Sequence, residues 1–143
     1  MTEVNLGGIV SLSMVDYPEH AAITIFFRGC SRRCKWCQNK EYLNGDTPVT
    51  IDSILNLIDD ASGFVDALVL SGGEPLEQIE AALEIASYAR ALGLKVGVHT
   101  SRKDILDEYK GAFDYAWVSD PHIHPAQPGS HTAIWYDHGG ARI

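Results

Sequence analysis

The chain has 143 residues, of which 45% are hydrophobic and 21% charged, and its formal net charge at pH 7 is −8. This length and composition indicate one globular domain over residues 1–143, and the negative charge argues against a broad nucleic-acid or membrane surface. No apolar run reaches the roughly 20 residues that cross a bilayer, and no signal-peptide pattern is visible. We therefore expect a cytoplasmic protein.

The first predicted elements lead into the three cysteines. Gly7-Gly8 suggests a turn, and the loose alternation over Ile9–Val15 predicts a short hairpin or an edge strand. The run Ala21–Phe27 is rich in β-forming residues and predicts a buried strand. This strand should end at Gly29, so that the cysteine-containing loop follows it directly.

All three cysteines, Cys30, Cys34 and Cys37, lie in this loop with the spacing C-x3-C-x2-C. Three thiolates this close can ligate one iron–sulfur cluster, which normally takes four cysteines. One iron would then have no cysteine ligand from this chain, and an open position is typical of catalytic metal sites. A zinc site completed by His20 or His99 and ordinary buried cysteines are the alternatives, whereas the odd count and short spacings argue against disulfides.

The residues around the cysteines allow two interpretations each. Arg28, Arg32, Arg33 and Lys35 could simply keep the loop soluble, or they could offset the charge of a thiolate-ligated cluster and dock an acidic electron donor. Trp36 could stack on a flat ring or shield a cluster from water, or it could pack in the core.

A strand-to-helix turn after the second strand carries the next unusual residues. Apolar residues at helical spacing predict a helix over residues 51–61, with Thr50 as its N-cap, followed by a strand over Ala67–Leu70. The sequence S-G-G-E-P follows at residues 71–75, and Pro75 suits the first position of a second helix, which Gly93 closes.

Gly72, Gly73 and Glu74 in this turn suggest a ligand site. Two glycines permit close approach of the backbone, the start of a helix favours an anion, and a carboxylate favours a cation. A ligand with an ammonium and a carboxylate group, such as an amino acid, would suit all three features. The alternative is a tight turn with a solvated glutamate.

Two further strands complete the pattern. Leu94–Val98 predicts a third strand, after which Ser101 would cap a short helix ending at Tyr109, and Phe113–Val118 predicts a fourth strand. The tail is rich in Pro, Gly and His, and it could add a strand over Ala133–Tyr136. Its four histidines allow a second metal site but are a compositional hint only: His122, His124, His131 and His138.

Strands that alternate with helices require a mostly parallel sheet with right-handed crossovers. Since a closed eight-stranded barrel needs about 250 residues, we predict an α/β fold: a partial, open (β/α) barrel of about four to six mostly parallel strands. The cysteine loop, S-G-G-E-P, H-T-S and S-D-P each follow a strand, so one rim should hold a single active site.

The motifs C-x3-C-x-W-C and G-G-E-P together resemble those of the radical S-adenosylmethionine (SAM) enzymes. The resemblance implies that the three cysteines hold a [4Fe–4S] cluster whose free iron is chelated by the amino and carboxylate groups of SAM. It implies cofactor-binding roles for six residues: Trp36, Gln38, Gly72, Gly73, Glu74 and Thr100.

Residues 7–100 look more narrowly like the activating enzymes of anaerobic (class III) ribonucleotide reductase, whose relatives activate pyruvate formate-lyase. The resemblance implies that a one-electron donor such as flavodoxin or ferredoxin reduces the cluster. SAM is then cleaved to methionine and a 5′-deoxyadenosyl radical, which takes a hydrogen atom from a glycine of the partner. Residues 119–143 match nothing in this pattern.

Two alternatives stay open. A radical SAM enzyme could act on another glycyl-radical enzyme or on a small molecule, as the deazapurine synthases do. The chain could also be a zinc-stabilised, non-catalytic binding module. No nucleic-acid or membrane partner is expected.

Overall fold

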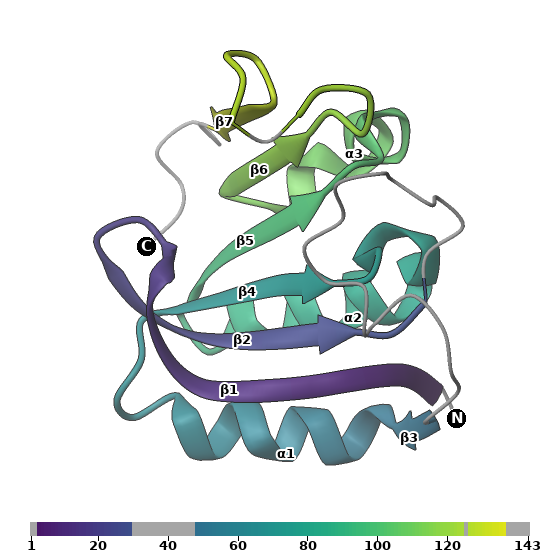
Figure 1. Ribbon diagram of the computed structural model, residues 1–143. Helices are drawn as coiled ribbons and strands as arrows, with labels where there is room; N and C mark the ends of the chain where they lie inside the picture. The colour runs from purple at the N-terminus through teal and green to yellow at the C-terminus, as the bar shows by residue number, and fades with distance from the viewer. Residues whose placement is uncertain (1–2, 30–47, 125, 137–143) are drawn as a thin grey trace.

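A seven-stranded sheet with the strand order β3-β1-β2-β4-β5-β6-β7 organises the computed structural model, which describes residues 3–29, 48–124 and 126–136 (Figure 1). The four central strands, β2, β4, β5 and β6, run parallel, whereas β1 and β7 are antiparallel to their neighbours. The strands are β1 (Glu3–Tyr17), β2 (His20–Phe27), β3 (Pro48–Thr50), β4 (Ala67–Gly72), β5 (Lys95–Thr100), β6 (Tyr115–Ser119) and β7 (His131–Trp135). The sheet is not closed, which confirms the predicted open α/β fold.

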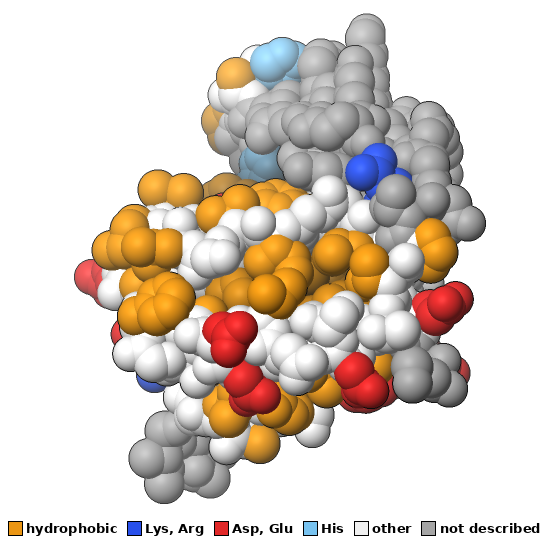
Figure 2. All heavy atoms as spheres, turned by 90° about the horizontal axis from the view of Figure 1, so that it is seen from below, with side chains coloured by type: hydrophobic (Ala, Val, Ile, Leu, Met, Phe, Trp, Pro, Cys, Tyr) orange, Lys and Arg blue, Asp and Glu red, His pale blue; other side chains and the backbone are white. Residues whose placement is uncertain are grey.

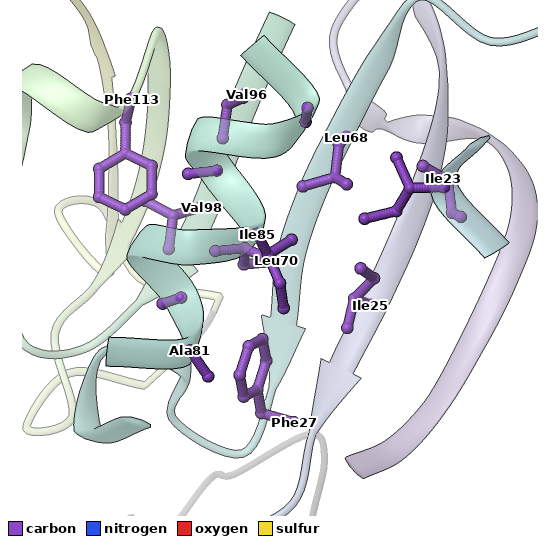
Figure 3. Packing of buried hydrophobic residues seen from close by; sticks show 14 of the residues in the cluster. Ile23, Ile25, Phe27, Leu68, Leu70, Ala81, Ile85, Val96, Val98 and Phe113 are labelled. Atoms are coloured by element: carbon purple, nitrogen blue, oxygen red, sulfur yellow. The ribbon is translucent and has the colours of Figure 1, made fainter. Parts of the chain in front are cut away.

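Helices cover one face of this sheet. They are α1 (Ile51–Ala61), η2 (Pro75–Gln78), α2 (Ile79–Ala91), α3 (Lys103–Tyr109) and η3 (Lys110–Ala112). Alternate residues of each central strand point at the helices, and Figure 3 shows Ile25, Leu70 and Val98 in the same core as Ile85 of α2. These side chains are fully buried, so burial of apolar area on this face is the main stabilising contribution.

The opposite face, called here the helix-free face, carries the remaining side chains of the strands. Near the amino ends of β4 to β6 it is filled by rings: Tyr17 lies 5.2 Å from Tyr115, and Tyr115 lies 4.5 Å from Trp135, between ring centroids. Further along the strands the same face carries the polar residues Ser71 and His99, whereas Thr24 of β2 lies level with Tyr115. The rings of Tyr17, Tyr115 and Trp135 therefore fill the half of this face away from the loops, and Ser71, His99 and Trp117 lie in the half next to the loops.

Several predicted elements differ in extent, and β1 differs most. β1 is 15 residues long, although its sequence alternates only loosely. The loose alternation arises because the pairing of β1 with β2 shifts register between Leu6 and Gly8, Val10 and Ser13, and Ser13 and Tyr17. Each such irregularity moves side chains to the other face and hides the period of two. β7 begins two residues before the predicted strand, and β3 is too short to give a pattern.

The predicted helix starts need one correction. Thr50 is the N-cap residue of α1, but its side chain makes no capping hydrogen bond. Ser101 does not cap α3; the N-cap is Arg102, and Ser101 instead donates its N–H and hydroxyl to Glu74. The helix begins one residue later than predicted, and both donors of Ser101 are directed at the buried carboxylate. Pro75 does occupy the first turn of η2.

Several large apolar side chains remain exposed, including Leu12, Met14 and Val15 of β1 at 53%, 67% and 85%. Figure 2 shows apolar side chains gathered on the underside of the molecule, with acidic side chains among them. The irregular pairing of β1 is a feature that limits edge-to-edge association of exposed strands. Among the described residues, no helix has the length and apolar character to cross a bilayer.

Candidate functional site

The glycine pair at the end of β4 lies directly against the chain that enters the cysteine loop. Gly73 donates its N–H to the carbonyl of Phe27 at 2.7 Å, and Glu74 donates its N–H to the carbonyl of Gly29 at 2.9 Å. A Cβ on Gly72 would lie 2.5 Å from the Phe27 backbone, and a Cβ on Gly73 would lie 2.4 Å from the Gly29 carbonyl oxygen. Only glycine fits there, so the two predicted motifs are joined backbone to backbone.

A second set of hydrogen bonds holds the same segment from the side of β1. The Gln78 side chain donates to the carbonyl of Arg28 at 3.0 Å and exchanges two hydrogen bonds with the backbone of Asn5, at 2.9 and 3.2 Å. Arg28 also donates its N–H to the carbonyl of Asn5 at 2.8 Å. Arg28, two residues before Cys30, is therefore anchored by Asn5 of β1 and Gln78 of η2, and Gly29 is held by the N–H of Glu74.

The Glu74 carboxylate is buried, with 1% of the residue exposed. It accepts four hydrogen bonds: Oε2 from Leu76 N and Thr100 Oγ1 at 3.0 and 2.7 Å, and Oε1 from Ser101 N and Oγ at 2.9 and 3.1 Å. Burial raises the pKa of Glu74, although these hydrogen bonds oppose the rise. The carboxylate therefore fastens the loop after β5 to the loop after β4.

Arg102 adds a second clamp between these two loops at the surface. Its guanidinium donates to Glu77 of η2 and to Asp104 of α3, each at 2.8 Å. The hydrogen bond from Arg102 lowers the pKa of Asp104 to about 2. The loops that follow β4 and β5 thus form one connected unit, in which Thr100 is bound to Glu74 on the helix-covered side.

The structure brings together Gly72, Gly73, Glu74 and Thr100 of the predicted site. Cys30, Cys34, Trp36, Cys37 and Gln38 lie outside the described residues. Of the described site residues, Gly73 and Glu74 contact Gly29, which immediately precedes the first cysteine.

The two histidines considered as zinc ligands already have partners. His99 uses both ring nitrogens, Nδ1 with Ser71 Oγ at 3.2 Å and Nε2 with the Asp16 carbonyl at 3.1 Å. His20 Nδ1 lies 2.8 Å from Asp66 Oδ2. A zinc site completed by His99 would have to break two hydrogen bonds, which weakens that alternative.

The tail histidines do not gather in the described part of the chain. His131 begins β7 and stacks on Trp117, with ring centroids 5.0 Å apart. His138 lies outside the described residues, and no group of three or more His, Cys, Asp or Glu side chains placed to hold a metal ion occurs among those described.

Sequence reasoning missed Gln78 and Ser101 as parts of this site. Gln78 lies 73 residues from Asn5 and 50 from Arg28 along the chain, and no local pattern predicts such a contact. Ser101 follows the third strand in the H-T-S sequence and could have been linked to Glu74 because both follow neighbouring parallel strands.

Known proteins that are similar to this chain belong to the family that its motifs resemble. The family model of the radical SAM superfamily matches residues 24–120. A candidate glycyl-radical enzyme activating enzyme of Methanocaldococcus jannaschii is 42% identical over 106 residues, which cover 72% of this chain and 43% of that protein. A pyruvate formate-lyase-activating enzyme of Listeria monocytogenes is 32% identical over 122 residues, covering 79% and 45%.

The chain spans less than half the length of these curated relatives. Among solved structures, QueE from Escherichia coli aligns with a TM-score of 0.57 and 17% identity, covering 69% of this chain and 52% of that one. At this identity the structural likeness supports the fold alone.

Proposed function

Because this chain belongs to the radical SAM superfamily, we propose that it is an activating enzyme that generates a glycyl radical on anaerobic (class III) ribonucleotide reductase. The superfamily implies a [4Fe–4S] cluster and SAM as cofactors. The observation that supports the proposal most strongly is the direct backbone pairing of Gly73 and Glu74 with Phe27 and Gly29. It fixes the entrance to the cysteine loop beside the segment expected to hold SAM.

The residues present fit these cofactors. Three cysteines within eight residues supply three thiolates, which suits an iron–sulfur cluster with one iron left for a further ligand. The end of β4 and the Gly29 backbone approach so closely that no side chain fits between them. In the proposal, Cys30, Cys34 and Cys37 hold the cluster.

The remaining proposed contacts divide between the two motifs. Trp36 and Gln38 of the cysteine motif, and Gly72, Gly73, Glu74 and Thr100 of the second motif and the next strand, are proposed to bind the cofactors. Because the Glu74 side chain already accepts four hydrogen bonds, we propose that it acts mainly by holding the backbone of both loops in place.

The bound cofactors supply the radical that removes a hydrogen atom from a glycine, and the protein supplies binding, orientation and shielding. Gly72 and Gly73 bring two backbone segments together, Gln78 and Glu74 fix them, and the rings of Tyr17, Tyr115 and Trp135 fill the far half of the helix-free face. The unclosed side of the sheet would leave room for a polypeptide loop of the partner.

The choice of partner rests on similarity to activating enzymes. The relative from Methanocaldococcus jannaschii carries a name of this class, and residues 7–100 carry the motifs that resemble the reductase activases. A one-electron donor such as flavodoxin or ferredoxin, a cytoplasmic location and a single domain over residues 1–143 belong to the same proposal.

Electron paramagnetic resonance tests the partner directly. The anaerobically reconstituted and reduced protein is mixed with SAM and either anaerobic ribonucleotide reductase or pyruvate formate-lyase. We expect a glycyl-radical signal with the reductase and none with the lyase. A signal with the lyase alone would reassign the partner, and no signal with either enzyme, despite cleavage of SAM, would reject activation of these two enzymes.

A further inference from the structure

A network of polar side chains lies on the helix-free face, and none of the roles proposed above involves it. It joins three strands: Ser71 of β4 contacts His99 of β5, and His99 contacts Asp16 of β1. Ser71 immediately precedes Gly72, and His99 immediately precedes Thr100. The network therefore lies at the same ends of the strands as the proposed SAM residues, but its side chains leave the sheet on the opposite face.

The hydrogen bonds determine which nitrogen of His99 carries the proton. The Asp16 carbonyl can only accept, so His99 Nε2, at 3.1 Å, must be the donor. In the neutral ring Nδ1 is then an acceptor, and the Ser71 hydroxyl, at 3.2 Å, donates to it. Burial lowers the pKa of His99, which favours this neutral ring.

Asp16 lies in an irregular part of β1, between the register positions of Ser13 and Tyr17, where side-chain hydrogen bonds hold the chain. The Asp16 carboxylate accepts hydrogen bonds from Ser13 Oγ at 2.7 Å and from Thr24 Oγ1 at 2.8 Å. The Ser13 hydroxyl oxygen in turn accepts from the backbone N–H groups of Val15 and Asp16. The orientation of the His99 ring is thus set by β1 and β2 rather than by β5 alone.

The oxygen of the Ser71 hydroxyl can accept a further hydrogen bond. Its proton is committed to His99, and within the described part of the chain no group donates to its oxygen. Only 5% of the residue is exposed, so water access is small. A hydroxyl that donates one hydrogen bond still has two lone pairs, so the Ser71 oxygen can accept a further hydrogen bond from a bound group.

We propose that Ser71 accepts a hydrogen bond from the molecule bound on the helix-free face, and that His99 is the positioning residue that turns the Ser71 hydroxyl for this contact. The proposal rests on the proposed function and adds a specificity contact to the same site. The ligand group is an N–H or O–H donor, which either SAM or the backbone of the glycine-bearing polypeptide could provide.

Two substitutions of His99 separate positioning from structural support. His99→Asn places an amide oxygen near the position of Nδ1, so it can still accept from Ser71, but it loses the donor to Asp16. His99→Gln places an amide nitrogen near Nε2, so it keeps the donor to Asp16 but loses the acceptor for Ser71. Ser71→Ala removes the proposed contact, and Ser130→Ala, which removes another Ser–His hydrogen bond, is the matched control.

The measurements are the Kd for SAM by equilibrium dialysis, the KM for the glycyl-radical partner, and the thermal midpoint, all with reconstituted protein. We expect Ser71→Ala and His99→Gln each to raise either the Kd for SAM or the KM for the partner about five- to tenfold. The double variant should show no further loss of affinity. His99→Asn and Ser130→Ala should stay within about twofold, although His99→Asn should lower the thermal midpoint more than His99→Gln.

A rise in the Kd for SAM would assign the donor to SAM, and a rise in the KM alone would assign it to the polypeptide. Wild-type affinity for both ligands in His99→Gln, or equal losses in His99→Asn and His99→Gln, would overturn the inference while the proposed function stands. A wild-type protein that cleaves no SAM would instead reject the proposed function itself, and with it this contact.

Discussion

The buried carboxylate of Glu74 gives the most informative test of how the site is held together. In Glu74→Gln an NH2 group replaces one of the two carboxylate oxygens. If it replaces Oε2, it faces the N–H of Leu76 and the hydroxyl of Thr100. If it replaces Oε1, it faces the N–H and the hydroxyl of Ser101. The hydroxyl can rotate and accept, but the backbone N–H is left buried without an acceptor. Such a group costs about 1–3 kcal/mol, reduced somewhat because the variant buries no charge.

We therefore expect Glu74→Gln to lower the free energy of unfolding by about 1–3 kcal/mol, or the thermal midpoint by about 3–10 °C. Denaturant titration of the reconstituted protein measures this loss. Glu77→Gln is the control, because Glu77 is partly exposed and its ion pair with Arg102 is worth about 0–1 kcal/mol. Equal stability losses in the two variants, with weaker SAM binding only in Glu74→Gln, would refute a holding role and favour direct contact with the ligand.

Three further predictions follow from the same contacts. Gly73→Ala must push apart two backbones that leave 2.4 Å for the new Cβ, so it should lose bound iron on gel filtration, whereas Gly111→Ala, with open space around it, should retain it. Gln78→Ala should lower the free energy of unfolding by about 1–2 kcal/mol, because it leaves the Arg28 carbonyl and the Asn5 N–H without the Gln78 side chain; an unchanged denaturation midpoint would contradict this. Burial lowers the folded-state pKa of His99 below its ordinary value of about 6.5. As the pH falls, the unfolded chain therefore takes up a proton on His99 at a higher pH than the folded protein does. The contribution of His99 to stability is then present above pH 6.5 and is lost as pH falls toward the folded-state pKa, by at most about 1.4 kcal/mol per pH unit. Denaturation between pH 7.5 and 6 should show this slope, reduced in His99→Gln, and equal slopes would disprove it.

The elements with a strong period were predictable from the sequence. α1 repeats Ile51, Ile54, Ile58 and Ala61 on one buried face, and β4 is an unbroken buried run, so each had a local signal that tertiary contacts only reinforced. The parallel order of the central strands followed from the alternation of strands and helices.

The parts that escaped prediction depend on contacts between distant segments. The register shifts of β1 come from its pairing with β2 and leave no regular period in the sequence. The Glu74 carboxylate was expected to meet a ligand's cation, but its four donors come from Leu76, Thr100 and Ser101. Ser101 was predicted as a helix cap because the local sequence allows it, whereas α3 begins one residue later and Ser101 donates to the Glu74 carboxylate from the neighbouring loop.

The central claim is that Cys30, Cys34 and Cys37 hold a [4Fe–4S] cluster with one iron open to SAM. The most direct measurement is 5′-deoxyadenosine formation from SAM by the anaerobically reconstituted, reduced protein, together with its iron and sulfide content. The account predicts a brown protein with about four irons and four sulfides that forms the product, and loss of product formation in Cys34→Ala. Colourless protein containing zinc, or product formation that persists in Cys34→Ala, would contradict it.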